Sequence, residues 1–294
     1  MNRIIDIHAH TSESVLWDLH TKSASLDTLR SLSKQYGISK IYLLATYFPL
    51  KKSTGLTNEI LLERVVNDPL FGCFGSLNLE TDFGTGLSQL TGLAQSGALS
   101  GIKIYSGYQN IVLSDPKFTP LFQLAEKHGL PVACHMGELH HCCPKNERET
   151  LNEFRCGKTY CAIDQQGDLA HPKQIGAVAK LFPKVNFIAC HLGNPFFDDM
   201  RQAMSECPNL YTDISGQFVS GTDEDSPKYR IFIKNEIEKF LKLEGGVERV
   251  LFGTDFPIQS YKDSLELVSS LKLSKGSREK ILWENSQKFL NPNK

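Results

Sequence analysis

Short apolar and β-branched runs recur along the chain, and a segment with helical spacing of apolar residues follows each of them. The runs are Ile4–Ala9, Lys40–Thr46, Phe71–Leu77, Gly101–Tyr105, Pro131–His135, Asn186–His191, Asn209–Ile214 and Arg249–Gly253. Most begin roughly 30 to 40 residues after the previous one, which is the length of a strand plus a crossover helix. The pattern therefore predicts eight strands that alternate with helices.

The intervening segments carry their own helix start and stop signals. Ser25 precedes a helix that Gly37 closes, and Thr119 is expected to cap a helix that begins with proline and ends at Gly129. Further helices are predicted for the face of Leu87, Leu90 and Leu93 up to Gly97, and for Pro172–Leu181, Phe196–Cys207, Ile231–Leu243, Ser264–Leu271 and Ser277–Leu290.

This order of elements predicts the α/β class and a single-domain (β/α)8 TIM barrel over residues 1–294. A doubly wound nucleotide-binding sheet has little support, because the first strand is not followed by a Gly-x-Gly-x-x-Gly or phosphate-loop motif. The interval after Pro131 is longer than its neighbours. We interpret residues 136–170 as a Cys/His-rich loop insertion after strand 5.

Composition narrows the class of protein further. The 294 residues are 40% hydrophobic, which supports a large core and excludes a disordered chain. The net charge is −1 and lysine and arginine do not cluster, so we expect neither nucleic acid nor a membrane as a partner. The start of the sequence has no apolar stretch of signal-peptide length. We expect a cytoplasmic protein that acts on a small molecule.

Candidate chemistry begins in the first strand. Strand alternation places Asp6, His8 and His10 on one face, and Ile5, Ile7 and Ala9 on the other. If the polar face points into the barrel, two histidines reach the carboxyl end of the strands, where active sites of this fold are built. A His-x-His pair on a strand is suited to bind one divalent ion.

Three other predicted strands also end abruptly in a polar residue. These residues are His135, His191 and Asp255. A single buried histidine is more often a hydrogen-bonded core residue, but four strands that deliver His or Asp to one rim indicate a metal site. Asn194, Asp213 and Ser215 also lie at strand ends, either as pocket residues or as loop caps.

The sequence resembles the amidohydrolase superfamily, and within it the subgroup that contains aminocarboxymuconate-semialdehyde decarboxylase and related lactonases. The matching motifs are Ile5–His10, Gly101–Tyr105, His135–Gly137, Phe182–Pro195, Leu251–Pro257 and Ile281–Ser286. They follow one another in the family's order along nearly the whole chain. The resemblance implies a TIM barrel with hydrolase or decarboxylase chemistry, and the family's usual assembly is a homodimer.

Carried over residue by residue, the resemblance implies that His8, His10, His135 and Asp255 bind one divalent metal ion. It also implies that His191 is the general acid or base and that Asp255 alternates between ligand and proton acceptor. Three imidazoles and a carboxylate suit zinc best. Zinc lowers the pKa of a bound water to about 7. Manganese, or a binuclear site, is the alternative.

Lys103 shares the inward face of its strand with Tyr105, and it has three interpretations. Both residues could bind a substrate carboxylate, because a buried ammonium needs an anionic partner. Lys103 could instead be carboxylated and bridge two metals, as in other branches of the superfamily, in which case His191 becomes a ligand. The structural alternative is an ion pair with Asp6 or Glu138.

The predicted insertion contains four cysteines, which are Cys142, Cys143, Cys156 and Cys161. Such a density of soft ligands raises the hypothesis of a structural zinc site. The spacing lacks the usual Cys-x2-Cys pairs, however, so unliganded loop thiols and a redox or disulfide role stay open.

The leading functional hypothesis is a metal-dependent hydrolase, with a metal-bound water as nucleophile, that acts on a small carboxylated or lactone or amide substrate. A non-oxidative decarboxylase that uses the same metal site is the alternative. A phosphoesterase is a third hypothesis, weakened because Asp255 is followed by Phe256 and Pro257 rather than by the Asp-x-His of such enzymes.

Overall fold

The structure, a computed structural model, describes residues 3–16, 19–46, 56–140, 167–223 and 225–290. Eight strands form one sheet in sequence order, and all neighbouring pairs from β1 to β8 are parallel. The strands are β1 Ile4–Ala9, β2 Ile38–Leu44, β3 Phe71–Ser76, β4 Gly101–Ile104, β5 Val132–Cys134, β6 Phe187–Ala189, β7 Leu210–Asp213 and β8 Val250–Leu251. Each lies within or close to a predicted run.

Backbone hydrogen bonds between β1 and the segment that begins with β8 close the sheet into a barrel. Ile7 N donates to Phe252 O at 3.0 Å and His10 N donates to Phe256 O at 2.7 Å. In the other direction, Asp255 N donates to His8 O at 2.7 Å. The predicted (β/α)8 barrel is therefore confirmed.

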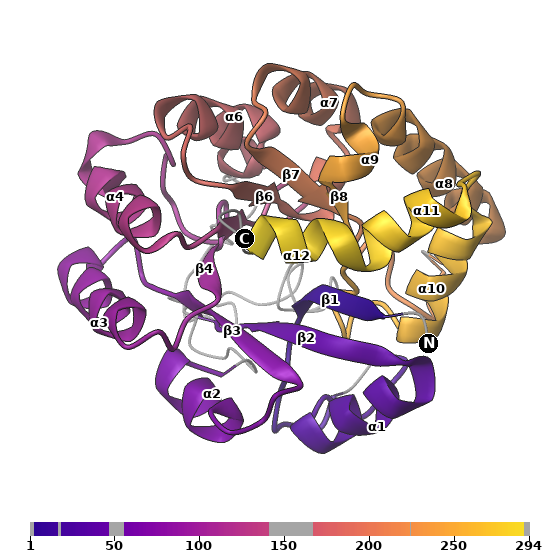
Figure 1. Ribbon diagram of the computed structural model, residues 1–294, viewed down its shortest axis with the longest axis horizontal. Coiled ribbons are helices and arrows are strands. Elements are labelled where there is room, and N and C mark those ends of the chain that lie inside the picture. Colours follow the sequence, from indigo (N-terminus) through magenta and orange to yellow (C-terminus); the bar gives the residue numbers. More distant parts are fainter. Residues whose placement is uncertain (1–2, 17–18, 47–55, 141–166, 224, 291–294) are drawn as a thin grey trace, which may run out of the picture.

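The helices lie around the strands, except that α12 crosses one end of the barrel (Figure 1). They are α1 Leu26–Tyr36, α2 Asn58–Val65, α3 Phe83–Gln95, α4 Thr119–His128, α6 Pro172–Leu181, α7 Phe197–Glu206, α8 Pro227–Leu241, α9 Gly246–Arg249, α10 Tyr261–Ser270, α11 Lys275–Glu279 and α12 Asn285–Leu290, with a π-helical turn at Lys280–Glu284. Within the described ranges, every helix is too short or too polar to span a lipid bilayer.

Most helix boundaries follow the predicted signals. Ser25 accepts a hydrogen bond from Thr28 N at the start of α1, and Gly37 ends α1 in the left-handed conformation at φ 70°. The prediction that Thr119 caps α4 is wrong: a short 3-10 turn at Pro116–Phe118 leads into the helix, and Thr119 is its first residue. Helix α2 was not predicted at all.

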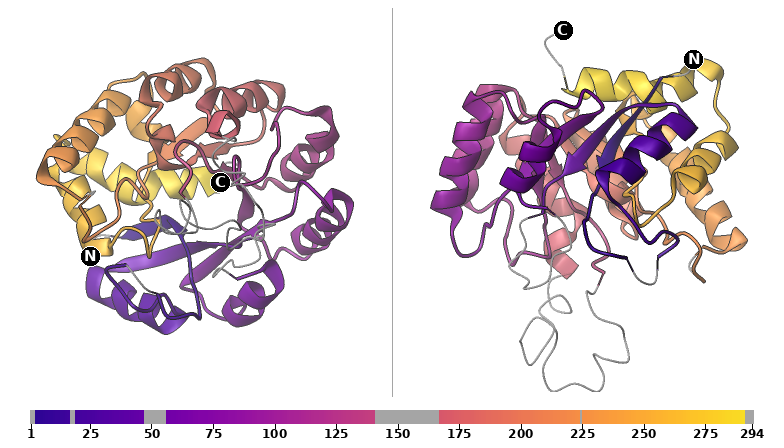
Figure 2. Two further views of the ribbon diagram at one scale, coloured as in Figure 1. Left: turned by 180° about the vertical axis from the view of Figure 1, so that it is seen from behind. Right: turned by 90° about the horizontal axis from the view of Figure 1, so that it is seen from below.

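The barrel interior holds a compact apolar cluster. It consists of Ile7, Leu44, Phe74, Ala133, Ile188, Cys190, Leu251 and Phe289. Phe289 belongs to α12, which crosses the end of the barrel where the strands begin (Figures 1 and 2). Helix α12 therefore seals this end with Phe289, and the opposite end is left for chemistry.

Strand β1 does not follow the simple alternation expected from the sequence. Asp6 is paired with Ile41 and Ala9 with Leu43, so β1 contains one extra residue between these two positions. As a result, Ile7 packs inside the barrel, whereas Ala9 packs in the larger core cluster outside it. The prediction that Asp6 and His8 lie together opposite Ile7 is wrong because a β-bulge shifts the pattern between them.

Asp6 connects β1 to the segment that follows β8. It accepts hydrogen bonds from Thr254 N at 3.1 Å and from Thr254 Oγ1 at 2.7 Å. Burial raises the pKa of Asp6 to about 6. Its role is therefore structural, next to the site rather than in it.

The predicted insertion lies mostly outside the described residues. Cys142, Cys143, Cys156 and Cys161 all fall between residues 141 and 166. The described part includes residues 136–140 and a 3-10 turn at Gly167–Ala170.

Candidate active site

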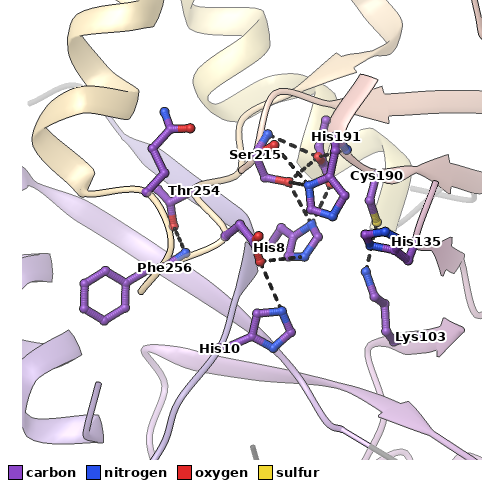
Figure 3. Close-up of polar contacts among 12 residues, drawn as sticks. His8, His10, Lys103, His135, Cys190, His191, Ser215, Thr254 and Phe256 are labelled. Carbon is purple, nitrogen blue, oxygen red and sulfur yellow. Dashed lines mark hydrogen bonds and ion pairs between the residues drawn. The ribbon is translucent and has the colours of Figure 1, made fainter. Parts of the chain in front are cut away.

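Three of the predicted ligands lie together where β1 and β8 end. Asp255 Oδ1 is 3.3 Å from His8 Nε2 and 3.2 Å from His10 Nε2. Ligand atoms of all three residues lie within 4.8 Å of one another. Figure 3 shows the imidazoles of His8 and His10 turned toward this common point. The arrangement brings two imidazoles and one carboxylate to a position that a divalent cation could occupy.

The imidazole of His8 is oriented by contacts at Nδ1, and its Nε2 faces Asp255. Nδ1 lies 2.9 Å from Asp213 Oδ2 and 3.0 Å from Ser215 Oγ. Nε2 is buried and makes no well-aligned hydrogen bond within the described residues, and the Asp255 carboxylate lies 3.3 Å from it. A buried nitrogen without such a hydrogen bond is costly unless something binds it. His8 therefore fits the role of a metal ligand oriented by a carboxylate behind it.

The pKa shifts of His10, His135 and His8 are also compatible with a metal site. Burial lowers the pKa of His10, although its hydrogen bond to Asp255 acts in the opposite direction. Burial also places the pKa of His135 well below its ordinary value. For His8, burial and Lys103 are outweighed by Cys190 and Asp213, so its pKa is raised, and a bound cation would displace that proton.

Asp213 contacts both His8 and the backbone of the candidate acid or base. Its Oδ1 accepts hydrogen bonds from His191 N at 2.9 Å and from Ser215 N at 3.2 Å. Burial acts to raise the pKa of Asp213, but His8 and His191 outweigh it and hold that pKa below its ordinary value. Asp213 is therefore an anion that orients two site residues at once.

His191 and Asp255 share an unusual backbone conformation. His191 has φ 63° and Asp255 has φ 56°, in the left-handed region that residues other than glycine rarely adopt. Gly216 faces both side chains: a Cβ there would lie 2.6 Å from Asp255 Oδ2 and 3.0 Å from His191 Nδ1. Such strain is typical of functional sites, where surrounding contacts hold it in place.

The ring of His191 stands between two other imidazoles. Its centre is 4.9 Å from that of His8 and 4.9 Å from that of His135. Its Nδ1 lies 3.1 Å from the carbonyl oxygen of Ser215, which only a protonated nitrogen can approach as a donor. Burial lowers the pKa of His191 to about 4, so the imidazole is neutral at pH 7.

His135 lies next to the cluster but is not part of it. Its Nε2 is 2.9 Å from the carbonyl oxygen of Glu138, and its ring packs against Tyr108. Among the described residues, the groups whose ligand atoms lie within 4.8 Å of one another are His8–His10–Asp255 and His8–Cys190–His191. The fourth predicted ligand is therefore adjacent, with its Nε2 engaged by the backbone.

Lys103 lies on the floor of the site. It is 1% exposed, and its Nζ is 3.1 Å from Cys190 Sγ (Figure 3). Within the described ranges no carboxylate lies within 4.0 Å of it, so the structural alternative, an ion pair with Asp6 or Glu138, is not observed. The hydroxyl of Tyr105 donates to the carbonyl oxygen of Ala45 at 2.8 Å.

A family model described as amidohydrolase matches residues 50–291 of the chain. The chain belongs to this family. The matched range contains His135, His191 and Asp255, whereas β1 with His8, and His10 directly after β1, precede it. No curated protein matches the chain in a sequence search.

Solved structures share the barrel of this amidohydrolase over nearly the full length of both chains. The 2,6-dihydroxybenzoate decarboxylase from Rhizobium has a TM-score of 0.70 at 17% identity and covers 100% of each chain. A probable 2-pyrone-4,6-dicarboxylic acid hydrolase from Acinetobacter baumannii, with citric acid bound, has a TM-score of 0.66 at 14% identity and covers 99% of this chain and 100% of its own. A dihydroxybenzoic acid decarboxylase from Polaromonas, with bound manganese and 2-nitroresorcinol, has a TM-score of 0.66 at 16% identity and covers 100% and 98%. These likenesses establish the shared fold.

Two features of this amidohydrolase site were not predicted. Asp213 and Ser215 were noted at a strand end, with loop capping as an equal alternative, and their contacts to His8 and His191 were not foreseen. Cys190 was not among the predicted site residues. Its position immediately before His191, at the end of an apolar run, was the available signal that it lies at the site.

Proposed function

We propose that this amidohydrolase is a metal-dependent hydrolase that opens a lactone or an amide in a small carboxylated substrate. The observation that carries the proposal is the buried, neutral imidazole of His191 beside the His8–His10–Asp255 group. We expect these three residues to bind one divalent ion, with His135 as the fourth ligand by resemblance, and zinc as the ion that suits the donors best. Such an ion lowers the pKa of water and polarises a carbonyl.

His191 has the properties of a general base in this reaction. Its Nδ1 donates to the carbonyl of Ser215, so Nε2 carries the lone pair that can accept a proton. Burial acts to raise the pKa of Asp255, but its contacts with His10 and His8 outweigh burial and hold that pKa well below its ordinary value. Both groups are proton acceptors at neutral pH, as nucleophilic attack of water on a carbonyl requires.

Lys103 is our candidate for substrate recognition. Its ammonium is buried, and within the described part of the chain it has no carboxylate partner. A substrate carboxylate would supply the missing charge and hold the rest of the substrate at the rim.

Decarboxylation is the alternative reaction for the same residues. It requires a proton to be delivered to carbon after carbon dioxide leaves, and His191 and Asp255 are the groups placed to deliver it. The two reactions are distinguished by their products.

The test is to load the purified protein with zinc or manganese and to supply two panels, one of carboxylated lactones and amides and one of carboxylated aromatics. We expect acid release from a lactone or amide, recorded at constant pH, without carbon dioxide. Carbon dioxide from the aromatic panel would replace hydrolysis by decarboxylation. Turnover of neither panel by metal-loaded protein would contradict the proposal.

The role of His191 is tested by His191→Asn. We expect turnover to fall by about 10²- to 10⁴-fold, as for loss of a general base, with the metal content unchanged. The matched control is His171→Asn, because His171 caps α6 outside the site and asparagine can also cap a helix. Loss of metal from His191→Asn would instead make His191 a ligand.

A further inference from the structure

Cys190, His8 and His191 form a second group of potential ligands beneath the first. Their ligand atoms lie within 4.8 Å of one another, and all three side chains are buried. Cys190 belongs to the apolar cluster inside the barrel, and its sulfur is the one thiol in the two groups of potential ligands found among the described residues. A thiol between two imidazoles offers the N2S ligand set that thiophilic ions such as zinc, cobalt and cadmium prefer.

We propose that His8, Cys190 and His191 form a sulfur-containing cation site that competes with the His8–His10–Asp255 site for His8. The two groups share this residue. Since Asp213 engages Nδ1 of His8, Nε2 is the nitrogen left for a cation. It makes no well-aligned hydrogen bond within the described residues, and the Asp255 carboxylate of the first group lies 3.3 Å from it. One imidazole nitrogen binds one ion, so the two sites exclude each other.

The identity of the ion decides which site is filled. Carboxylate oxygen is a good ligand for manganese, whereas a thiolate is not, so manganese selects His8, His10 and Asp255. A thiophilic ion gains a metal–sulfur bond by moving to Cys190, and the S–H bond breaks with release of its proton to solvent. The consequence is that a strongly thiophilic ion such as cadmium draws His8 and His191 away from the positions that catalysis requires.

The charges around the second site are mixed. Lys103 Nζ lies 3.1 Å from the sulfur and repels a cation, whereas Asp213 lies directly behind both His8 and His191. The carboxylate and the thiolate together offset the charge of a divalent ion, and the ammonium leaves the complex with one net positive charge. This balance makes the site weaker than a structural zinc site.

Cobalt gives a direct spectroscopic readout that does not depend on turnover. We would use protein in which Cys142, Cys143, Cys156 and Cys161 are serine, so that thiols outside the described residues do not contribute. Titration with cobalt is expected to produce sulfur-to-cobalt charge-transfer absorption in the near ultraviolet. The band is expected to disappear in Cys190→Ala and Cys190→Ser and to persist in the control Cys207→Ser, whose sulfur contacts Gly176 elsewhere.

Two further outcomes test the competition. Asp255→Asn is expected to keep the band, and saturating manganese is expected to suppress it in protein with Cys190 intact. A band that survives Cys190→Ala, or no band at all in protein that keeps its near-ultraviolet circular dichroism, would overturn the site. A band that persists at full manganese occupancy would overturn the competition. None of these results depends on which substrate the enzyme hydrolyses.

Discussion

Replacing Asp213 by asparagine is expected to weaken metal binding without removing any ligand. The amide oxygen can still accept from His191 N and Ser215 N, as Asp213 Oδ1 does at 2.9 and 3.2 Å. The amide NH2 then faces His8 Nδ1, where Oδ2 now lies at 2.9 Å. His8 must become an acceptor at Nδ1, which places its proton on Nε2, the nitrogen that is needed for the cation.

The size of the effect follows from the number of contacts that change. One oriented imidazole switches to the wrong tautomer, and a buried carboxylate that holds its ring is lost. Loss of such an outer partner typically costs 10- to 100-fold in metal affinity. The expected change for Asp213→Asn is therefore about 1.4 to 2.8 kcal/mol in binding free energy.

The assay is a competition titration of zinc between the protein and a coloured chelator. Asp198→Asn is the matched control, because Asp198 is 96% exposed and lies on α7 away from the site. Urea unfolding of both variants without metal separates loss of affinity from loss of fold. An affinity within twofold of the parent protein, in a folded Asp213→Asn variant, would refute the assigned tautomer and the positioning role of Asp213.

Three other predictions address the site and the fold. Gly216→Ala is expected to lower kcat by about 100-fold, because the new Cβ displaces Asp255 and His191, and small misplacements of catalytic groups have effects of this size. The control is Gly276→Ala, because Gly276 lies on α11 with open space around it. Equal kinetics in the two variants would contradict the crowding at Gly216. Removal of metal by a chelator is expected to abolish turnover and to lower the unfolding free energy by about 2.7 kcal/mol relative to protein in a 100-fold excess of metal over Kd; an unchanged thermal midpoint would contradict a site that is filled in the folded state. Burial raises the pKa of Asp263, but hydrogen bonds from two serines and an arginine outweigh it and lower that pKa. Asp263 therefore stabilises the fold above its ordinary pKa of 3.8 and loses this effect as the pH falls through its lower folded value, so urea unfolding should show a deficit in Asp263→Asn at pH 7 that shrinks toward pH 3; a deficit that is constant with pH would exclude an electrostatic origin.

The barrel could be predicted because most residues of its strands are buried, whichever face of the sheet they lie on. Such strands are continuous apolar runs, and the sequence marks their ends by abrupt polar residues. His191 and Asp255 were found in this way, and so was the pairing of Ser25 and Gly37 at the ends of α1. Helix α2 was not predicted because its apolar and polar residues are poorly separated into two faces. It is held in place by Asn58, whose side chain hydrogen-bonds to the backbone N and O of Ser76.

The remaining errors arise where the pattern of burial carries no information. All six residues of β1 are buried, so hydrophobicity cannot tell which of them face inward, and the bulge after Asp6 is visible only in the hydrogen-bond register. The contact between Lys103 and Cys190 also could not be predicted from the sequence. Cys190 follows an apolar run and resembles any core cysteine, and only the folded sheet brings its sulfur to the ammonium.

The short β8 strand has a mechanical consequence for the whole barrel. Strand β8 has only two residues, Val250 and Leu251. The junction between β1 and the segment that begins with β8 therefore depends on a few backbone hydrogen bonds around His8 and Asp255. A cation bound by His8, His10 and Asp255 would connect the two sides of this junction. The amides of His10 and Asp255 should then exchange hydrogen more slowly when metal is bound, so that the chemistry of the enzyme and the closure of its barrel depend on the same three side chains.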